Sequence, residues 1–284
     1  MIKMQNVSIS FGSKKVLDNL TFHVEKNEIF GFLGPSGAGK TTTLKLLTKQ
    51  LVADSGEIEL FDLPVKEVNR EMFNKIGILS DNSSAYERLS VEENVMFFAQ
   101  LRKVGKERVN QIISDIGLGK DKKTKYSKLS KGMRQRVILA CAIIHEPTML
   151  FLDEPTSALD PVTTLKVHQM ILDLNKKGTT IFLTTHNMEE ADKLCNRVAF
   201  LNEGKIRELG NPERLKIAYA RNKLVLQTNN EEKLDFEKTI EGLKKIIDVA
   251  SEKGLVSLHS VEPTLEEIFL EVTGRSLVNE NLDA

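Results

Sequence analysis

A glycine-rich segment that begins at Gly34 constrains this chain more than any other feature. It reads Gly34-Pro-Ser-Gly-Ala-Gly-Lys-Thr41 and matches the pattern G-x-x-x-x-G-K-[ST]. An apolar run at 28–33 precedes it, and leucines at helical spacing follow it at Leu44, Leu47 and Leu51. A strand, a glycine loop and a helix in this order surround a phosphate with backbone N–H groups and a helix N-terminus. The sequence therefore predicts a nucleotide-binding unit.

Each position of this phosphate loop has an expected task. The glycines let the backbone curl closely around the phosphates, Lys40 reaches the β- and γ-phosphates, and the Thr41 hydroxyl binds Mg²⁺. We expect the nucleotide to be held by Gly34, Pro35, Ser36, Gly37, Ala38, Gly39, Lys40, Thr41 and Thr42.

The composition restricts the classes of protein that the chain can belong to. Its 284 residues are 40% hydrophobic and 28% charged, which suits one large or two smaller globular domains. Lys+Arg and Asp+Glu are both 40, and this zero net charge argues against a nucleic-acid partner. Cys141 and Cys195 form no disulfide framework, and we expect reduced thiols. The longest apolar run, 137–144, is far below the roughly 18–20 residues of a membrane span, so any membrane role requires a partner.

The order of the expected elements predicts a parallel sheet flanked by helices. Short apolar strands are expected at 2–9, 20–25 and 28–33, and buried strands at 148–152 and 179–184, with a helix from Pro161 to before Gly178. Between 70 and 128 the pattern is mainly helical. A domain boundary is expected at the shift near 210–212, which gives domains at 1–212 and 213–284.

The second domain reads as a small α/β appendage. We expect a strand at 223–227, a helix at 232–247, an alternating segment at 255–261 and a helix at 264–272. In the last helix Thr264 and Glu267 form a capping box, and Gly274 ends it.

Two carboxylates, Asp153 and Glu154, directly follow the apolar run 148–152. At the carboxyl end of a parallel strand such groups face the ligand crevice. Asp153 would hold Mg²⁺, and Glu154 would polarise the attacking water as a general base. Taken alone, a helix cap or a solvated pair explains them as well, but the phosphate loop favours the catalytic interpretation.

Three further motifs resemble those of ABC ATPases. Leu129-Ser-Lys-Gly-Met133 is similar to the L-S-G-G-Q signature, Ser157-Ala-Leu-Asp160 to the D-loop, and His186 to the switch histidine. The order of all these motifs over residues 1–212 matches one nucleotide-binding domain of that family. The resemblance implies an α/β P-loop NTPase of the ABC type, with a mainly parallel core sheet, an antiparallel β part and a helical subdomain at about 82–134.

The resemblance also implies roles for residues outside the phosphate loop. Phe11 matches the aromatic residue that stacks on adenine. His186 would sense the γ-phosphate and orient the attacking water, next to the catalytic residues Glu154 and Lys40. Three more residues would complete the nucleotide site across a head-to-tail dimer: Ser130, Gly132 and Asp160. The expected cofactors are ATP and Mg²⁺, with Thr41, Asp81 and Asp153 as the metal residues.

The chain departs from the family pattern at three positions. Lys131 and Met133 replace a glycine and the glutamine of the signature, while Ser130 and Gly132 are kept. Asp81 stands where the family has a glutamine, if 76–81 is aligned with that loop. We expect Asp81 to alter nucleotide or Mg²⁺ affinity and to couple ATP to a membrane partner. The alternative is an ordinary loop residue and an alignment off by one.

The end of the chain is similar to a subgroup of the family. The segment 263–275 and the signature form Ser130-Lys-Gly-Met-Arg-Gln-Arg136 look like those of drug, antibiotic and lantibiotic exporters of the bacitracin-resistance type. The resemblance implies an ATP-hydrolysing subunit that binds a separate membrane permease, lies on the cytoplasmic face of the membrane and pairs with a second copy. We expect one of the adjacent Phe97 and Phe98 to line a groove that binds the permease. The alternative is that both side chains only pack in the core.

Three other functions stay open at this point. The first is an importer ATPase. The second is a soluble ABC protein that acts on nucleic acid or ribosomes, which the zero net charge, the lack of a long coiled coil and the single ATPase domain disfavour. The third is a nucleotide sensor without catalysis, which the presence of both Glu154 and His186 disfavours.

Overall fold

The computed structural model describes residues 1–80, 85–157 and 159–274. Its contacts divide the chain into two compact units, Met1–Leu209 and Gly210–Ala284. Within the described ranges, no helix combines the length and apolar character needed to cross a bilayer.

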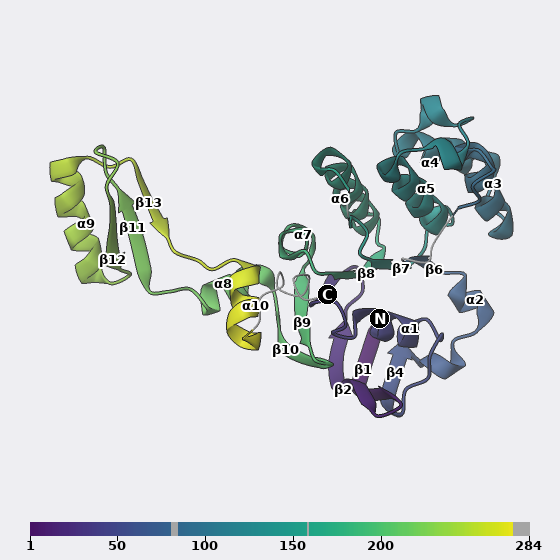
Figure 1. Ribbon diagram of the computed structural model, residues 1–284, viewed down its shortest axis with the longest axis horizontal. Helices are drawn as coiled ribbons and strands as arrows, with labels where there is room; N and C mark the ends of the chain where they lie inside the picture. The colour runs from purple at the N-terminus through teal and green to yellow at the C-terminus, as the bar shows by residue number, and fades with distance from the viewer. Residues whose placement is uncertain (81–84, 158, 275–284) are drawn as a thin grey trace. The chain divides into compact units, whose positions relative to one another are not determined.

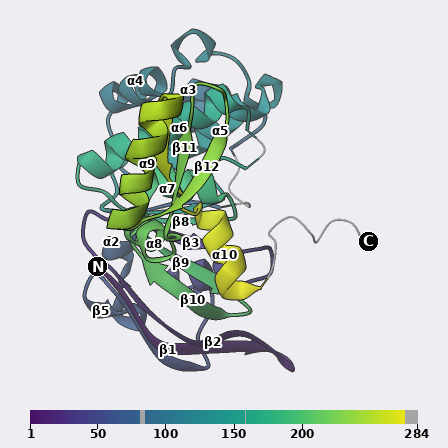
Figure 2. The same ribbon diagram turned by 90° about the vertical axis from the view of Figure 1, so that its left-hand side faces the viewer.

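The first unit contains a six-stranded sheet that positions the phosphate loop. Its strands lie in the order β10 (Lys205–Gly210), β9 (Arg197–Asn202), β3 (Ile29–Leu33), β8 (Thr180–Thr185), β7 (Met149–Asp153) and β6 (Ile76–Leu79). Figure 2 shows the succession of β8, β3, β9 and β10. From β9 to β6 all neighbours pair in parallel. The carboxyl ends of β3, β7 and β8 therefore meet at one edge, as expected for a crevice that binds a ligand.

An antiparallel sheet packs with this parallel sheet in the same unit. Its order is β2 (Lys14–Val24), β1 (Ile2–Phe11), β4 (Ser55–Leu60) and β5 (Leu63–Pro64). Alternate residues of β1 are buried, among them Ile2 and Met4, and they share one core with Leu44 and Leu47 of α1 (Lys40–Leu47). Five phenylalanine rings lie at the centre of this core: Phe22, Phe30, Phe32, Phe151 and Phe182.

Some helices of the first unit lie against the sheets, and others form a cluster of their own. The cluster consists of α3 (Val91–Leu101), α4 (Lys106–Asp115) and α5 (Lys131–Ile143), which pack on one another (Figure 1). The remaining helices of this unit are α2 (Arg70–Phe73), α6 (Pro161–Lys176) and α7 (Met188–Leu194). Cys141 and Cys195 are free thiols, both buried. Burial raises the pKa of the Cys141 thiol to about 12.

The second unit is a three-stranded antiparallel sheet with helices. The strands lie in the order β12 (Lys233–Glu237), β11 (Lys223–Gln227) and β13 (Ser257–Ser260). The helices are α8 (Pro212–Ala218), α9 (Ile240–Lys253) and α10 (Leu265–Thr273). The expected capping box of Thr264 and Glu267 and the left-handed Gly274 at the end of α10 are confirmed.

The expected helix at 232–247 is wrong in its first half. Residues 233–237 form β12, and α9 begins only at Ile240, with Thr239 as its N-cap. In the strand, Leu234 pairs with Leu226 and Phe236 with Leu224. This alternation places both apolar side chains on one face of the strand, which a helical arrangement of the segment does not allow. Phe236 packs there against the small core of Leu224, Leu226 and Ile246. The expected mainly helical stretch at 70–128 also contains one strand, β6.

Candidate active site

The phosphate loop connects β3 to α1 and depends on two glycines. Gly39 is the N-cap of α1 with φ +113°, and a Cβ there would lie 2.5 Å from Cδ2 of Leu17. A Cβ on Gly34 would lie 2.2 Å from the carbonyl oxygen of Leu201. At Gly34 the close atom belongs to the backbone and does not move aside, and at Gly39 the left-handed φ strains any other L-residue, so both positions require glycine. The loop therefore keeps its backbone close against β9 and the strand β2.

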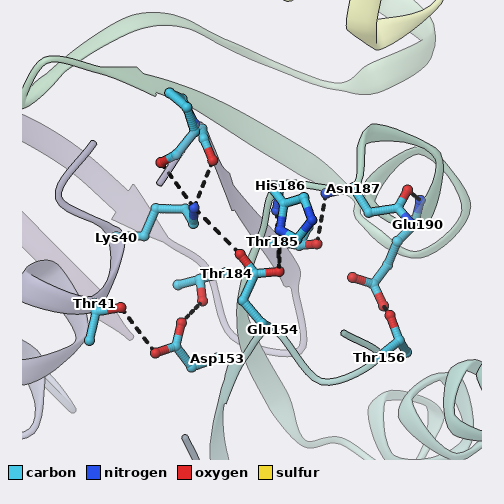
Figure 3. A network of polar contacts seen from close by, with 12 residues as sticks. Lys40, Thr41, Asp153, Glu154, Thr156, Thr184, Thr185, His186, Asn187 and Glu190 are labelled. Atoms are coloured by element: carbon cyan, nitrogen blue, oxygen red, sulfur yellow. Dashed lines mark hydrogen bonds and ion pairs between the residues drawn. The ribbon is translucent and has the colours of Figure 1, made fainter. Parts of the chain in front are cut away.

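Lys40 lies beneath the loop with its side chain almost fully buried. Its Nζ donates to the carbonyl oxygens of Gly34 at 2.7 Å and Pro35 at 3.2 Å. The same Nζ lies 3.4 Å from Oε1 of Glu154 (Figure 3). An ammonium group held in this way balances a negative charge that enters the loop, and a phosphate oxygen would compete with Glu154 for it.

Asp153 and Thr41 bring oxygen atoms together at the end of β7. The Thr41 hydroxyl donates to Oδ2 of Asp153 at 3.1 Å, and the Thr184 hydroxyl donates to Oδ1. Asp153 is buried, with 2% of its surface exposed. A buried carboxylate with two hydroxyl partners leaves a compact set of hard oxygen donors next to the phosphate loop.

Glu154 has a left-handed backbone, with φ +49°, which is uncommon for a residue other than glycine. Its N–H donates to the Thr184 carbonyl at 2.9 Å, which fixes this turn against β8. The carboxylate then lies between two basic groups, because Oε2 is 2.8 Å from Nδ1 of His186 and Oε1 faces Lys40 (Figure 3). Its side chain is 17% exposed, and that of His186 is 56% exposed. Such a carboxylate is accessible to a water molecule and is oriented by a neighbouring imidazole.

These groups line one pocket of about 480 Å³. Seven of the expected nucleotide residues of the loop line it: Pro35, Ser36, Gly37, Gly39, Lys40, Thr41 and Thr42. The expected metal residue Asp153 lines it as well. Glu154 and His186 line it from the side of β7 and β8. Phe11 also lines the pocket and is 49% exposed, so its ring is available to a planar partner.

Three expected nucleotide residues lie at helix starts instead of among the described lining residues. Ser130 is the N-cap of α5, where its hydroxyl accepts from the Met133 N–H at 3.3 Å, and Gly132 lies in the first turn of that helix. Asp160 is the N-cap of α6 and accepts from the Thr163 N–H at 2.9 Å. Hydrogen bonds from Thr163 lower the pKa of the Asp160 carboxyl. The expected metal residue Asp81 lies outside the described residues.

A buried polar cluster behind the pocket was not expected from the sequence. Oε1 of Glu190 in α7 accepts from the Thr156 hydroxyl at 2.6 Å and lies 3.1 Å from Nε2 of His168 in α6. Glu190 is 1% exposed, and its Oε2 has no hydrogen-bond partner among the described residues. Since Thr156 follows Glu154 by two residues, Glu190 ties the loop after β7 to the helix after His186. No motif signals this cluster, because its members are 22 and 34 residues apart.

Replacing Glu190 by alanine should destabilise the first unit, because it leaves the Thr156 hydroxyl and the His168 ring buried without their partner. Each group left unpaired costs about 1–3 kcal/mol. Glu190→Gln, which keeps an acceptor oxygen, should cost less. The measurement is the thermal unfolding midpoint of the full chain, with Glu189→Ala on the exposed face of α7 as the matched control. An equal shift for Glu190→Ala and Glu189→Ala would contradict this role.

Comparison with known proteins identifies the family of this chain. Residues 17–157 match the family model described as "ABC transporter". The chain is also 39% identical to the fluoroquinolones export ATP-binding protein MT2762 of Mycobacterium tuberculosis, over 91% of this chain and 87% of that protein. This chain belongs to the ABC transporter family. The expected resemblance is thereby confirmed, and the chain is an ABC ATPase that binds ATP.

Two further comparisons agree with this assignment. The ABC ATPase is 29% identical to the bacitracin transport ATP-binding protein BcrA of Enterococcus faecalis, over 98% of this chain and 90% of BcrA. Among solved structures, the dimeric ATP-binding cassette MJ0796, in a post-hydrolysis state bound to ADP and Pi, superposes with a TM-score of 0.66. It is 25% identical and covers 74% of this chain and 98% of that one. The expected α/β fold of the ABC type is confirmed, and the ATP-binding proteins of export systems in this family work with membrane permeases.

Proposed function

We propose that this ABC ATPase powers the export of drug-like, antimicrobial-peptide or lipid-like molecules through a separate membrane permease. The observation that carries the catalytic part is the position of Glu154, between Lys40 and His186 in the pocket beside the phosphate loop. The export part rests on the relatives, which are named for fluoroquinolone export and bacitracin transport.

The pocket supports a defined placement of ATP. The loop N–H groups and the start of α1 would bind the phosphates, with Lys40 on the β- and γ-phosphates and the Phe11 ring on the adenine. Thr41 and Asp153 fit Mg²⁺, because a hydroxyl and a carboxylate 3.1 Å apart are the hard oxygen donors that this ion prefers. When bound, Mg²⁺ would neutralise charge on the phosphate oxygens.

The residues of this chain would divide the hydrolysis step between them. Glu154 accepts a hydrogen bond from the attacking water and removes its proton, and His186 keeps the carboxylate oriented through the 2.8 Å contact with Oε2. Lys40, relieved of its contact with Glu154 by the γ-phosphate, stabilises the charge that builds up on the transferred group.

A second copy of the chain would complete the site. Ser130 is the N-cap of the 13-residue helix α5 and Gly132 lies in its first turn, and this N-terminus is suited to a γ-phosphate presented by a partner subunit. Asp160 is the N-cap of α6 in the same subunit, and the Thr163 side chain of that helix lies next to Gly132. In a two-fold dimer, the N-terminus of α5 in each subunit would face the nucleotide bound by the other subunit. The dimeric state of MJ0796 supports this arrangement.

A groove on the first unit is suited to the permease. It has a volume of about 630 Å³ and lies between α2, β6, α3 and α5. Its apolar lining includes Phe73, Phe98, Leu101 and Ile138. Of the two adjacent phenylalanines, Phe98 lines the groove, whereas Phe97 packs edge-on against Tyr86 with ring centroids 4.9 Å apart. A short helix from the cytoplasmic side of the permease would bury this apolar surface and hold the ATPase at the membrane.

The proposed function is tested by recovery of the permease. A tagged Glu154→Gln chain is purified from detergent-solubilised membranes of its native host with ATP and Mg²⁺, and the co-purifying proteins are identified by mass spectrometry. A polytopic membrane protein in stoichiometric amount is the expected result, absent when the tag alone is expressed. Recovery only in the soluble fraction, alone or with ribosomes or DNA, contradicts the proposal.

A further inference from the structure

The groove between α2, α3 and α5 contains charge as well as apolar surface. Besides its phenylalanines, its lining includes Arg70, Arg102 and His145, and no aspartate or glutamate is among the described lining residues. A groove that is apolar and positive selects a partner that is apolar and negative. The position and surroundings of these three basic groups therefore decide what the groove binds.

Arg102 lies at the C-terminal end of α3, where its Nη1 donates to Oδ1 of Asn74 at 2.7 Å. No carboxylate of the described residues forms an ion pair with it. Burial lowers the pKa of the Arg102 guanidinium, and no acid in the described part of the chain offsets that effect. Arg108 on the next helix provides the contrast, since it lies 3.4 Å from a carboxylate oxygen of Glu146 and 4.0 Å from one of Asp115. Among the described residues, Arg102 is therefore a half-buried cation without a counter-charge, which is costly unless a partner supplies one.

His145 does not supply a second positive charge. Its Nε2 lies 3.0 Å from the carbonyl oxygen of Ile76 and has the geometry of a donor to it. Burial, and secondly the charge of Arg102, lower the pKa of His145. The neutral form of the imidazole is therefore favoured, and the positive charge of the groove is that of Arg102, with Arg70 at the exposed start of α2.

We infer that the groove binds a short helix of the permease through a carboxylate that pairs with Arg102. The apolar residues on either side of this acidic residue pack on Phe98 and on Leu101, which is 65% exposed. This inference rests on the proposed function, because it names the chemistry of the permease segment. Pairing with a planar carboxylate in a partly desolvated groove favours arginine over lysine at this position.

The test is a charge exchange in the intact complex. Once the permease is identified, the tagged chain is prepared as Arg102→Glu and recovered from membranes as above. We expect recovery of the permease to fall at least about tenfold, because the substitution places two carboxylates in contact. Arg221→Glu, the same change at an exposed arginine of the second unit, should leave recovery unchanged. ATP binding and the unfolding midpoint of purified Arg102→Glu should equal those of the wild type.

The second step identifies the acidic partner. Each aspartate and glutamate of the cytoplasmic segments of the permease is replaced singly by arginine and co-expressed with Arg102→Glu. One replacement should restore recovery. If Arg102→Glu leaves the recovery of the permease unchanged, or if no replacement restores the lost recovery, the inference is overturned and the proposed function still stands. Failure to recover any membrane protein with the wild-type chain contradicts the proposed function itself.

Discussion

Replacing Glu154 by glutamine should lower the rate constant of ATP hydrolysis by about 10²–10⁴ and leave ATP binding intact. Glutamine has the shape of glutamate but does not accept a proton from water. Lys40 keeps its two carbonyl partners in the loop, so the phosphate-binding end of the pocket stays in place. The lost charge removes only the contacts to Lys40 and His186.

The measurements are single-turnover hydrolysis and equilibrium binding of ATP by the purified chain. Lys40→Ala is the control, because it removes the ammonium group from the loop and should abolish binding and hydrolysis together. With ATP bound and not consumed, Glu154→Gln should also elute as a dimer in size-exclusion chromatography. A hydrolysis rate within about tenfold of the wild type would show that Glu154 is not the general base.

Replacing Phe182 by alanine should destabilise the first unit by about 3–5 kcal/mol. Phe182 is fully buried on β8. Its ring centroid lies 6.0, 5.9, 5.5 and 5.9 Å from those of Phe22, Phe30, Phe32 and Phe151. These rings come from three parallel strands and from β2 of the antiparallel sheet. A cavity at Phe182 therefore weakens the packing of both sheets on their shared core.

The measurement is hydrogen exchange of the backbone amides of β3 and β8, because the free energy of opening these strands reports on the first unit alone. Phe11→Ala is the matched control, since this ring is 49% exposed. It should change the exchange of the core amides little and weaken ATP binding. Equal effects of the two substitutions on core exchange would contradict the central place of Phe182.

Much of the fold follows from local patterns in the sequence. The wholly apolar segment Met149–Leu152 indicates a buried parallel strand because both of its faces are covered, and β7 has this environment. The Asp160-Pro161 start of α6 and the Thr264 capping box are chemical signals that act within one turn. The strand at 223–227 is also predicted with its observed bounds.

The failures are segments whose structure depends on distant partners. At 233–237 the pattern Lys-Leu-Asp-Phe-Glu alternates as in a strand, but it is only five residues long and runs into the helical pattern that begins at Ile240. The pairing with β11 separates the two elements. The Glu190 cluster is similar, because neither Thr156 nor His168 shows in sequence that it donates to a glutamate in another helix. The phosphate loop and the Asp153-Glu154 pair are recognisable because their chemistry lies within adjacent residues.

The position of β3 between β8 and β9 has a consequence for the synthesis of this protein on the ribosome. A nascent chain that ends before Thr180 contains the whole glycine loop but neither strand that borders β3. Until those strands emerge, all five residues of β3, which are buried in the finished protein, have no hydrogen-bonded neighbours in the sheet. The apolar segments of the growing chain therefore need protection from aggregation during that interval.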